Sequence, residues 1–312
     1  MDNTAAMIGA GLIGRAWAMV FARAGWTVRL YDSNPAQLTD ARAYIGLSLA
    51  EQQGAGLCDD AVAAGERIAY VSSLETAVTG VAWVHEHLPE QLELKRAMFG
   101  ELDRLTNDEA ILASSTSAIP ASQFTEGLAG RARCLVAHPV NPPHLVPVVE
   151  LCGAPWTVSA TIERAHTIMC KVGQVPVIVR REIDGFILNR LQGALLSEAM
   201  RLVEEGYVSP DDLDKTIKDG LGLRWSFMGP FETIELNAPG GVADYCARYS
   251  AFYRRLAADA PRPDVWEDQQ AARVVSALDA PLTSAERERR TRRRDRRLLA
   301  LRQHKIASSN TE

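Results

Sequence analysis

The amino-acid sequence predicts an α/β protein with a doubly wound, mostly parallel sheet followed by a second, all-helical domain. Its 312 residues are enough for two domains with a sizeable core in at least one. In the first part of the chain short apolar runs alternate with helix-length stretches, which is typical of a parallel sheet covered on both faces. Beyond residue 182 the apolar spacing is helical. We therefore expect an α/β domain over residues 1–184 and a helical domain over residues 185–312.

The chain opens with a predicted strand, helix and strand. An apolar run at residues 5–8 is followed by a glycine-rich turn and by a helix-length apolar segment over residues 15–24, which Gly25 ends. Residues 27–31 have the β-branched and aromatic content of a strand. This order predicts one βαβ unit.

Five more short apolar runs predict the rest of the sheet, at residues 81–84, 110–113, 134–137, 146–151 and 175–179. The Pro-rich segment 139–147 is too short to contain a crossover helix. We therefore expect the two runs that flank it to be antiparallel neighbours near the far edge of the sheet.

The second part of the chain is predicted to be helical. Residues 185–205 form one long helix that Gly206 ends, and Ser209 caps the next helix. Residues 284–302 are Arg-rich and contain no Gly or Pro, so they predict a further helix, either solvated or facing another subunit.

The charge distribution argues against nucleic acid as the main partner. The net charge is −5, yet residues 281–312 carry ten basic and four acidic side chains, so the rest of the chain is clearly acidic. No stretch of eighteen apolar residues occurs, so no membrane span is predicted.

The cysteines and the N-terminal residues predict a cytoplasmic location. The five cysteines show no C-x-x-C spacing and read as reduced thiols, without a metal site. No basic segment followed by an apolar one precedes the first strand, so no secretion signal is expected.

A glycine-rich loop predicts a dinucleotide site. Residues 9–14 match G-x-G-x-x-G between a strand and a helix, and Asp32 ends the next strand, which is the context of a Rossmann-type domain. Asp32 accepts ribose hydroxyls and repels a 2′-phosphate, so NAD is favoured over NADP. We expect the loop to bind the diphosphate through its three glycines and through the amides at the start of the helix, that is through Gly9, Gly11, Leu12, Ile13 and Gly14.

A histidine and a glutamate predict a general base. His138 follows an apolar strand run that delivers it to the ligand-binding edge of the sheet. A histidine alone in this place is more often structural, but an antiparallel pairing brings Glu150 alongside it. A carboxylate there orients the ring and stabilises imidazolium, so the pair suits removal of a hydroxyl proton.

With these motifs the chain resembles the 3-hydroxyacyl-CoA dehydrogenase superfamily, and most closely its lambda-crystallin and L-gulonate 3-dehydrogenase branch. The motifs cover nearly the whole chain in order and run through residues 9–14, 114–117, 137–143, 185–190, 203–206 and 228–230. The resemblance implies an NAD-dependent dehydrogenase that acts on a 3-hydroxy group of a small substrate and forms a homodimer through its helical domain.

The resemblance also implies roles for individual residues. His138 is similar to the family's general base and Glu150 to its partner, and Ser117 and Asn189 resemble the groups that hold the reacting oxygen. From the residues alone, Ser117 also suits a helix cap and Asn189 a helix-bonded amide. Two more residues resemble neighbours of the nicotinamide half of NAD, and their alternative is a surface ion pair: Glu90 and Lys95.

One segment departs from the acyl-CoA members. Where those read Gly-x-Gly-Tyr-Pro-Met-Gly-Pro, residues 220–230 here contain two extra residues and Arg224. A guanidinium binds a free carboxylate in bidentate fashion, and a thioester offers none. Our hypothesis is that Arg224 selects free 3-hydroxy acids such as L-gulonate; the alternative is an ion pair at a subunit contact.

Several other functions stay open. Within enzymes these are a 3-hydroxybutyryl-CoA dehydrogenase and a carnitine-type 3-hydroxy acid dehydrogenase. Outside enzymes they are a crystallin-like structural protein and an NAD-binding sensor. The presence of His138, Glu150, Ser117 and Asn189 together favours an enzyme.

Overall fold

The computed structural model describes residues 3–261, 263–277 and 282–309. Its contacts divide the chain into two units: residues 1–189 with residues 292–312 form the first, and residues 190–291 form the second. The boundary that we predicted after residue 184 stays a prediction. The division by contacts falls slightly later because the start of the long helix α8 (Leu188–Glu204) is bonded to the first unit.

The first unit contains an eight-stranded sheet in the order β3-β2-β1-β4-β5-β6-β7-β8. All neighbouring strands are parallel except β6 and β7, which are antiparallel. The doubly wound, mostly parallel sheet is therefore confirmed. The strands are β1 (Thr4–Ile8), β2 (Thr27–Tyr31), β3 (Ile68–Val71), β4 (Trp83–Glu86), β5 (Ile111–Ser114), β6 (Cys134–Pro139), β7 (Val148–Gly153) and β8 (Val175–Val179).

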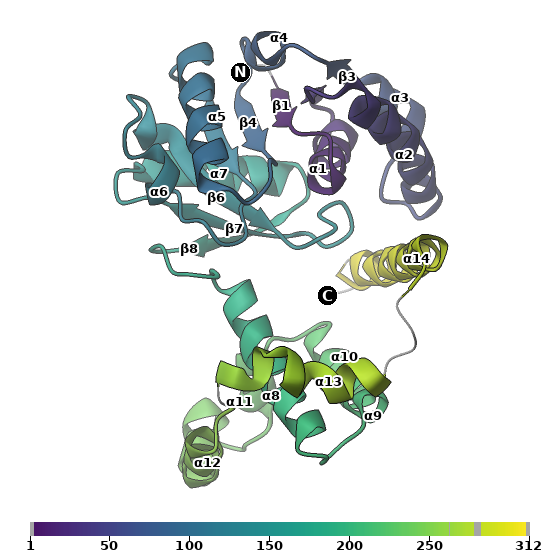
Figure 1. Cartoon of the computed structure of the whole chain (residues 1–312), viewed down its shortest axis with the longest axis vertical. Helices are drawn as coiled ribbons and strands as arrows, with labels where there is room; N and C mark the ends of the chain where they lie inside the picture. The colour runs from purple at the N-terminus through teal and green to yellow at the C-terminus, as the bar shows by residue number, and fades with distance from the viewer. Residues whose placement is uncertain (1–2, 262, 278–281, 310–312) are drawn as a thin grey trace. The chain divides into compact units, whose positions relative to one another are not determined.

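Helices cover both faces of this sheet (Figure 1). Because side chains alternate along a strand, Ala5 and Met7 of β1 enter one apolar core, whereas Ala6 and Ile8 enter the other. The helices of this unit are α1 (Leu12–Arg23), α2 (Pro35–Gly54), α3 (Ala61–Glu66), α4 (Leu74–Val78), α5 (Leu92–Leu105), α6 (Ser122–Thr125), η1 (Arg131–Arg133) and α7 (Ser159–Lys171).

The strands β6 and β7 pair in the predicted antiparallel sense. Their register places His138 directly opposite Glu150. The Pro-rich connection between them allows no crossover helix, so β7 must return beside β6. Because β7 runs antiparallel to β6, the polar side chains of His138 and Glu150 come into contact within two otherwise apolar strands.

Within its described residues the second unit contains helices joined by turns and no strand, and the predicted helical domain is confirmed. Ser209 caps α9 by accepting a hydrogen bond from the amide of Asp212, as its position before Pro210 predicts. Beyond α8, this unit contains α9 (Pro210–Lys215), the π-helical segment η2 (Thr216–Leu221), α10 (Gly222–Trp225), α11 (Pro230–Leu236), α12 (Gly241–Ala258), η3 (Pro263–Trp266) and α13 (Asp268–Ala277).

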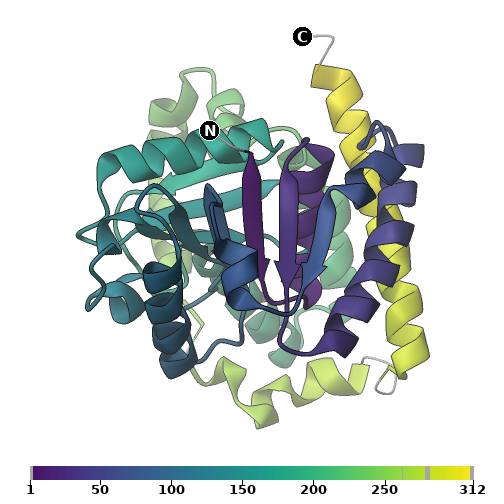
Figure 2. The same cartoon turned by 90° about the horizontal axis from the view of Figure 1, so that it is seen from above.

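The Arg-rich segment forms the last helix, α14 (Ser284–Ser309). Its residues from 292 onward belong to the first unit, where Leu299 is buried. Figure 2 shows this helix beside α2. Despite the length of α14, none of the described helices is apolar and long enough to cross a membrane.

A buried histidine predicts a stability loss in mild acid. Burial, with Arg23, Arg15 and Arg294 nearby, lowers the pKa of His144 to about 3. In the unfolded chain the pKa is about 6.5, so unfolded molecules bind more protons between these values and stability falls as the pH falls from about 6.5 towards 3. We expect His144→Leu to reduce the loss of unfolding free energy between pH 7 and pH 5 by about 2 kcal/mol.

The measurement is urea unfolding at both pH values. His304→Leu is the control, because His304 is exposed on α14. If the His144 variant and wild type lose the same free energy of unfolding between the two pH values, His144 is not buried in its neutral form.

Candidate active site

The glycine loop between β1 and α1 has the geometry that a diphosphate requires. Gly9 has φ +103°, a conformation that favours glycine, and a Cβ on Gly14 would lie 1.8 Å from the Gly9 carbonyl oxygen. No side chain caps the first turn of α1, which begins at Leu12. Its amides therefore face outward for an anion. The loop fits a dinucleotide.

Asp32 stands at the end of β2 and ties the loop to the strand. One carboxylate oxygen accepts the amide of Ala10 at 2.9 Å, and the other accepts the amide of Asn34 at 2.9 Å. Each oxygen keeps lone pairs for ribose hydroxyls. This position is the one from which an acidic side chain selects NAD.

A pocket of about 280 Å³ lies at the carboxyl ends of the central strands. It brings together four residues that the sequence singled out, Ile13, Glu90, Ser117 and His138. It adds Ser115, Pro139 and Asn141, which lie in the motif segments but had no predicted role, and His87 and Leu88, which were not predicted at all. Since ligands of doubly wound folds bind at this edge, polar residues directly after a strand, such as His87, were the available signal.

His138 and Glu150 form a buried hydrogen-bonded pair. His138 Nδ1 lies 2.8 Å from Glu150 Oε2, and their side chains are 6% and 3% exposed. A carboxylate only accepts, so Nδ1 carries the proton and Nε2 keeps its lone pair. The ring lines the pocket. In this tautomer His138 is able to take a proton from a ligand.

The second carboxylate oxygen of Glu150 holds the start of α8. Glu150 Oε1 accepts the amides of Ile187 at 2.8 Å and Leu188 at 3.0 Å. Burial by itself raises the pKa of Glu150, but the bonds from His138 and from these amides outweigh it and lower the pKa. Glu150 is thus held as a carboxylate, the state that stabilises imidazolium on His138.

Phe186 packs against the dyad from the turn before α8. It is fully buried, and its ring centroid lies 5.5 Å from that of His138. Its φ of 47° is unusual for a residue with a side chain, and such strain persists where the surroundings enforce it. Phe186 lies in the motif segment 185–190, but the sequence predicted no role for it.

Ser117 and Asn189 lie close together, whereas their predicted role in holding the reacting oxygen stays a prediction. Asn189 Nδ2 donates to the Ser117 carbonyl oxygen at 3.0 Å. The turn that contains Ser117 is held by Glu90, whose Oε1 accepts the amides of Ser117 at 3.1 Å and Ala118 at 3.0 Å and the hydroxyl of Thr116. Glu90 therefore orients Ser117 towards the pocket that both residues line.

Lys95 lies in a closed polar network instead of at the surface. Its side chain is fully buried, and its ammonium donates to both oxygens of Glu86, at 3.1 and 3.0 Å. Glu86 also accepts the hydroxyl of Ser114 at 2.6 Å. A direct contact of Lys95 with the nicotinamide half of NAD stays a prediction. Its visible role is to hold the ends of β4 and β5, and Glu86 was missed although an acid in an apolar strand needs such a partner.

On the face of the sheet opposite Lys95 and Glu86, the hydroxyl of Ser115 connects two histidines, His85 and His87. The hydroxyl of Ser115 lies 2.9 Å from His87 Nδ1 and 2.9 Å from His85 Nε2, and His85 Nε2 also lies 3.3 Å from the Ala137 carbonyl oxygen. Burial lowers the pKa of both histidines, for His85 to about 3. Since the carbonyl only accepts, His85 Nε2 carries a proton, and Ser115 is left to donate to His87.

Arg224 lies on α10 in the second unit and is exposed. Within that unit its charge acts on Tyr245 of α12, whose pKa it lowers against the larger opposing effects of Tyr253 and of burial. Selection of a carboxylate by Arg224 therefore stays a proposal.

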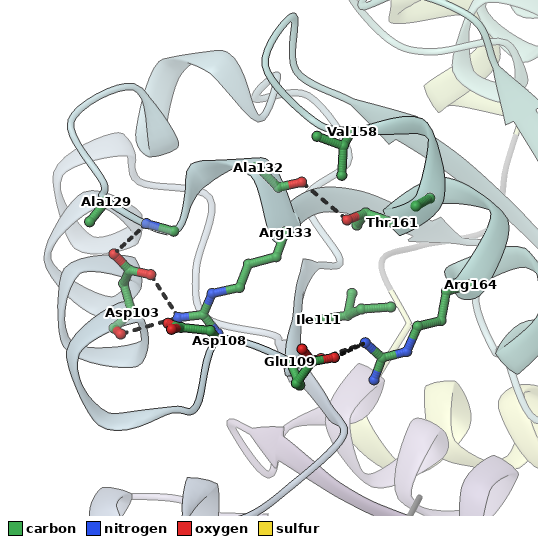
Figure 3. A pocket seen from close by; sticks show the side chains of 12 residues that line it. Asp103, Asp108, Glu109, Ile111, Ala129, Ala132, Arg133, Val158, Thr161 and Arg164 are labelled. Carbon is green, nitrogen blue, oxygen red and sulfur yellow. Dashed lines mark hydrogen bonds and ion pairs between the residues drawn. The ribbon is translucent and has the colours of Figure 1, made fainter.

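A larger cavity of about 690 Å³ lies at the other end of the sheet (Figure 3). The residues that line it lie at the amino ends of β5 and β6. Its two arginines already have partners: Arg133 pairs with Asp103 at 2.7 Å, and Arg164 donates to the Glu109 carbonyl. Ligands of this fold bind at the opposite edge. We therefore take the smaller pocket as the candidate active site.

A dinucleotide loop, a buried histidine–carboxylate pair and a polar pocket beside them define an NAD-dependent dehydrogenase. Sequence models of the 3-hydroxyacyl-CoA dehydrogenase family match both parts of the chain, the NAD binding domain over residues 4–183 and the C-terminal domain over residues 185–272. The protein belongs to the 3-hydroxyacyl-CoA dehydrogenase family and is an NAD-dependent 3-hydroxy acid dehydrogenase.

Individual relatives agree with this assignment. Lambda-crystallin of Oryctolagus cuniculus is 48% identical over 80% of this chain and 79% of its own length. The L-carnitine dehydrogenase/betainyl-CoA thioesterase of Ruegeria pomeroyi is 37% identical over 79% of this chain and 50% of its own. A solved NAD⁺-dependent structure, 5-formyl-3-hydroxy-2-methylpyridine 4-carboxylic acid 5-dehydrogenase, matches with a TM-score of 0.85 at 26% identity, over 97% of this chain and 98% of that one.

Proposed function

We propose that the protein oxidises the 3-hydroxyl group of a small, free hydroxy acid such as L-gulonate. The observation that carries this proposal is the pairing of His138 with Glu150 at 2.8 Å in the pocket that also contains Ser117. Among the similar proteins, one is named an L-carnitine dehydrogenase and another an NAD⁺-dependent 5-dehydrogenase of a 5-formyl pyridine acid. Both names support NAD-dependent dehydrogenation of a small acid, and neither identifies the substrate of this protein.

Proton removal follows from the dyad. His138 Nε2 takes the hydroxyl proton of the substrate, and the positive ring that results is stabilised by the carboxylate of Glu150. Ser117 makes no hydrogen bond through its hydroxyl within the described residues, so this hydroxyl is available to the reacting oxygen. Asn189 approaches the same turn from α8. NAD on the loop of residues 9–14 supplies the hydride acceptor when bound.

The substrate class is tested by following NADH formation with L-gulonate, 3-hydroxybutyrate, L-carnitine and 3-hydroxybutyryl-CoA, with NADP as the cofactor control. We expect turnover of at least one free acid with NAD. Turnover of the CoA ester alone contradicts the free-acid proposal. Absence of turnover with all four, in a protein that binds NAD, favours the sensor or the crystallin-like role.

Arg224 is proposed to bind the carboxylate of the substrate. Loss of a bidentate, charge-assisted contact costs about 2 kcal/mol, so we expect Arg224→Ala to lower kcat/KM for the preferred free acid about thirtyfold. The matched control is Arg254→Ala, an exposed arginine on α12 of the same unit. Steady-state kinetics decide: an unchanged kcat/KM in the Arg224 variant removes the residue from substrate recognition.

We further propose that the protein forms a homodimer through its second unit. Among the described residues of this unit only Val203, Thr233, Ala238 and Val265 are buried, so it lacks a core of its own. Large apolar side chains are exposed instead, including Phe227, Phe231 and Leu236 near α11 and Phe252, Tyr253 and Leu256 on α12. A second copy covers such surface. Light scattering tests this, and a monomer at micromolar concentration refutes it.

We also propose a cytoplasmic location, which the cysteines support. All five are free thiols, and Cys58, Cys134 and Cys152 are buried. Reduced cysteines are typical of that compartment. Cell fractionation tests this, and recovery of the protein in an oxidising compartment contradicts it.

A further inference from the structure

The loop that joins the two dyad strands is held by two arginines. We name residues 140–147, between β6 and β7, the dyad loop. Arg23 of α1 donates to the carbonyl oxygen of His144 at 2.8 Å. Arg302 of α14 donates to the next carbonyl, that of Leu145, at 3.4 Å, and to the carbonyl of Gly173 before β8 at 3.1 Å. Two consecutive carbonyls of the dyad loop are thus bound by different helices, one of which comes from the end of the chain.

The contact is part of an ordered seat for α14. Asp295, Leu299 and Arg302 follow one another at i, i+4 and i+7, so they share one face of the helix. Asp295 is 9% exposed and Leu299 6% exposed, whereas Arg297, on the opposite face, is exposed. Arg302 is therefore placed by the packing of its helix and does not reach the loop as a free surface side chain.

Electrostatics do not explain why an arginine stands at position 302. Burial, and after it the charge of Arg302, lowers the pKa of Arg23 to about 10. The two guanidiniums repel each other, and burial lowers the pKa of Arg302 as well. An apolar side chain would fill this place without repulsion. What the guanidinium adds is two directed hydrogen bonds to backbone carbonyls.

The dyad loop matters because of what it connects. It begins next to His138 and Pro139 and ends shortly before Glu150, and its residue Asn141 lines the same pocket as His138. The amides of Leu145 and Val146 both donate back to the Pro142 carbonyl, so the loop is folded into a compact turn. Because these bonds connect Leu145 to the start of the loop, we expect a displacement of Leu145 to shift Asn141 and the strand ends that carry the dyad.

We propose that α14 is a positioning element of the active site, in which Arg302 holds the dyad loop so that His138 and Asn141 keep their reactive places. Catalysis in the first unit then depends on the last helix of the chain. The inference rests on the proposed function, because it takes the His138–Glu150 pair to be the catalytic dyad.

The test compares three variants of the full chain. Arg302→Met removes the guanidinium but keeps the apolar stem, Arg302→Lys keeps the charge and one donor group, and Arg297→Met changes an exposed arginine of the same helix. For each we measure kcat and KM with the substrate that wild type turns over best, the Kd for NADH by fluorescence, the Tm, and hydrogen exchange at the amides of Leu145 and Val146.

We expect Arg302→Met to lower kcat about tenfold, with a near-normal Kd for NADH, because a small misplacement of a reacting group costs at least this much. Exchange at the two loop amides should become about tenfold faster, and the Tm should change little because repulsion of Arg23 is lost too. Arg302→Lys should recover part of kcat, and Arg297→Met should match wild type.

The proposal is overturned if Arg302→Met has the kcat of wild type, if it lowers kcat without faster exchange in the dyad loop, or if Arg297→Met lowers kcat equally. A wild-type protein that turns over no substrate removes the proposed function instead. Even then, the loop exchange reports whether Arg302 holds the loop.

Discussion

Replacement of His138 by asparagine is expected to lower kcat about 1000-fold while NAD still binds with its normal Kd. Asparagine is similar in size and polar, but it does not accept a proton at neutral pH, and general-base catalysis contributes about 10²- to 10⁴-fold. The dinucleotide loop depends on Gly9, Gly14 and Asp32, none of which contacts His138 by a hydrogen bond. Cofactor binding is therefore separable from chemistry in this variant.

The measurement combines NADH formation at pH 7 with a fluorescence titration of NADH. A suitable control is His166→Asn, since His166 lies on α7, away from the pocket-lining residues. A near-normal kcat at neutral pH removes His138 as the base. A parallel loss of NADH binding shows instead that the substitution disturbs the loop.

Replacement of Glu150 by glutamine is expected to lower kcat by about 10³- to 10⁴-fold, as large an effect as loss of the base itself. The amides of Ile187 and Leu188 require an acceptor, so the one amide oxygen of glutamine turns towards α8. The NH₂ group then faces His138 Nδ1 and donates to it. This forces the proton of the neutral ring onto Nε2, the atom that must be free to accept one.

Two comparisons separate this tautomer effect from simple damage to the fold. Glu182→Gln is the matched control, because Glu182 likewise accepts a backbone amide, that of Ser122 at 2.8 Å, outside the dyad. The double variant with His138→Asn should be no slower than either single variant, since residues that act as one unit are not additive. Multiplicative losses in the double variant, or a normal kcat in Glu150→Gln, contradict the dyad.

The parts of the site that follow from local sequence were predictable. The turn at Gly9, the close packing at Gly14 and the end of β2 at Asp32 each depend on neighbouring residues and on the order strand, loop, helix. The pairing of His138 with Glu150 was predictable for a different reason. The connection between their strands is too short for a helix, and this leaves only the antiparallel arrangement, which the register confirms.

Contacts between distant segments were not predictable in the same way. The burial of Lys95 depends on Glu86 and Ser114 reaching it from two strands, whereas its sequence context is that of a surface helix. His87 and Ser115 lie far apart in the chain and meet only because β4 and β5 are neighbours. No spacing along the sequence records which strands become neighbours.

The amino-acid sequence by itself determined the class of fold, the dinucleotide loop and the dyad, because each follows from short-range chemistry or from a connection too short to allow an alternative. Only the tertiary structure decided that Glu150 also holds α8, that Glu90 orients the turn of Ser117, and that Arg302 of α14 binds the dyad loop. These are hydrogen bonds between segments that packing of the apolar cores brings together. Their geometry therefore exists only once the chain has folded.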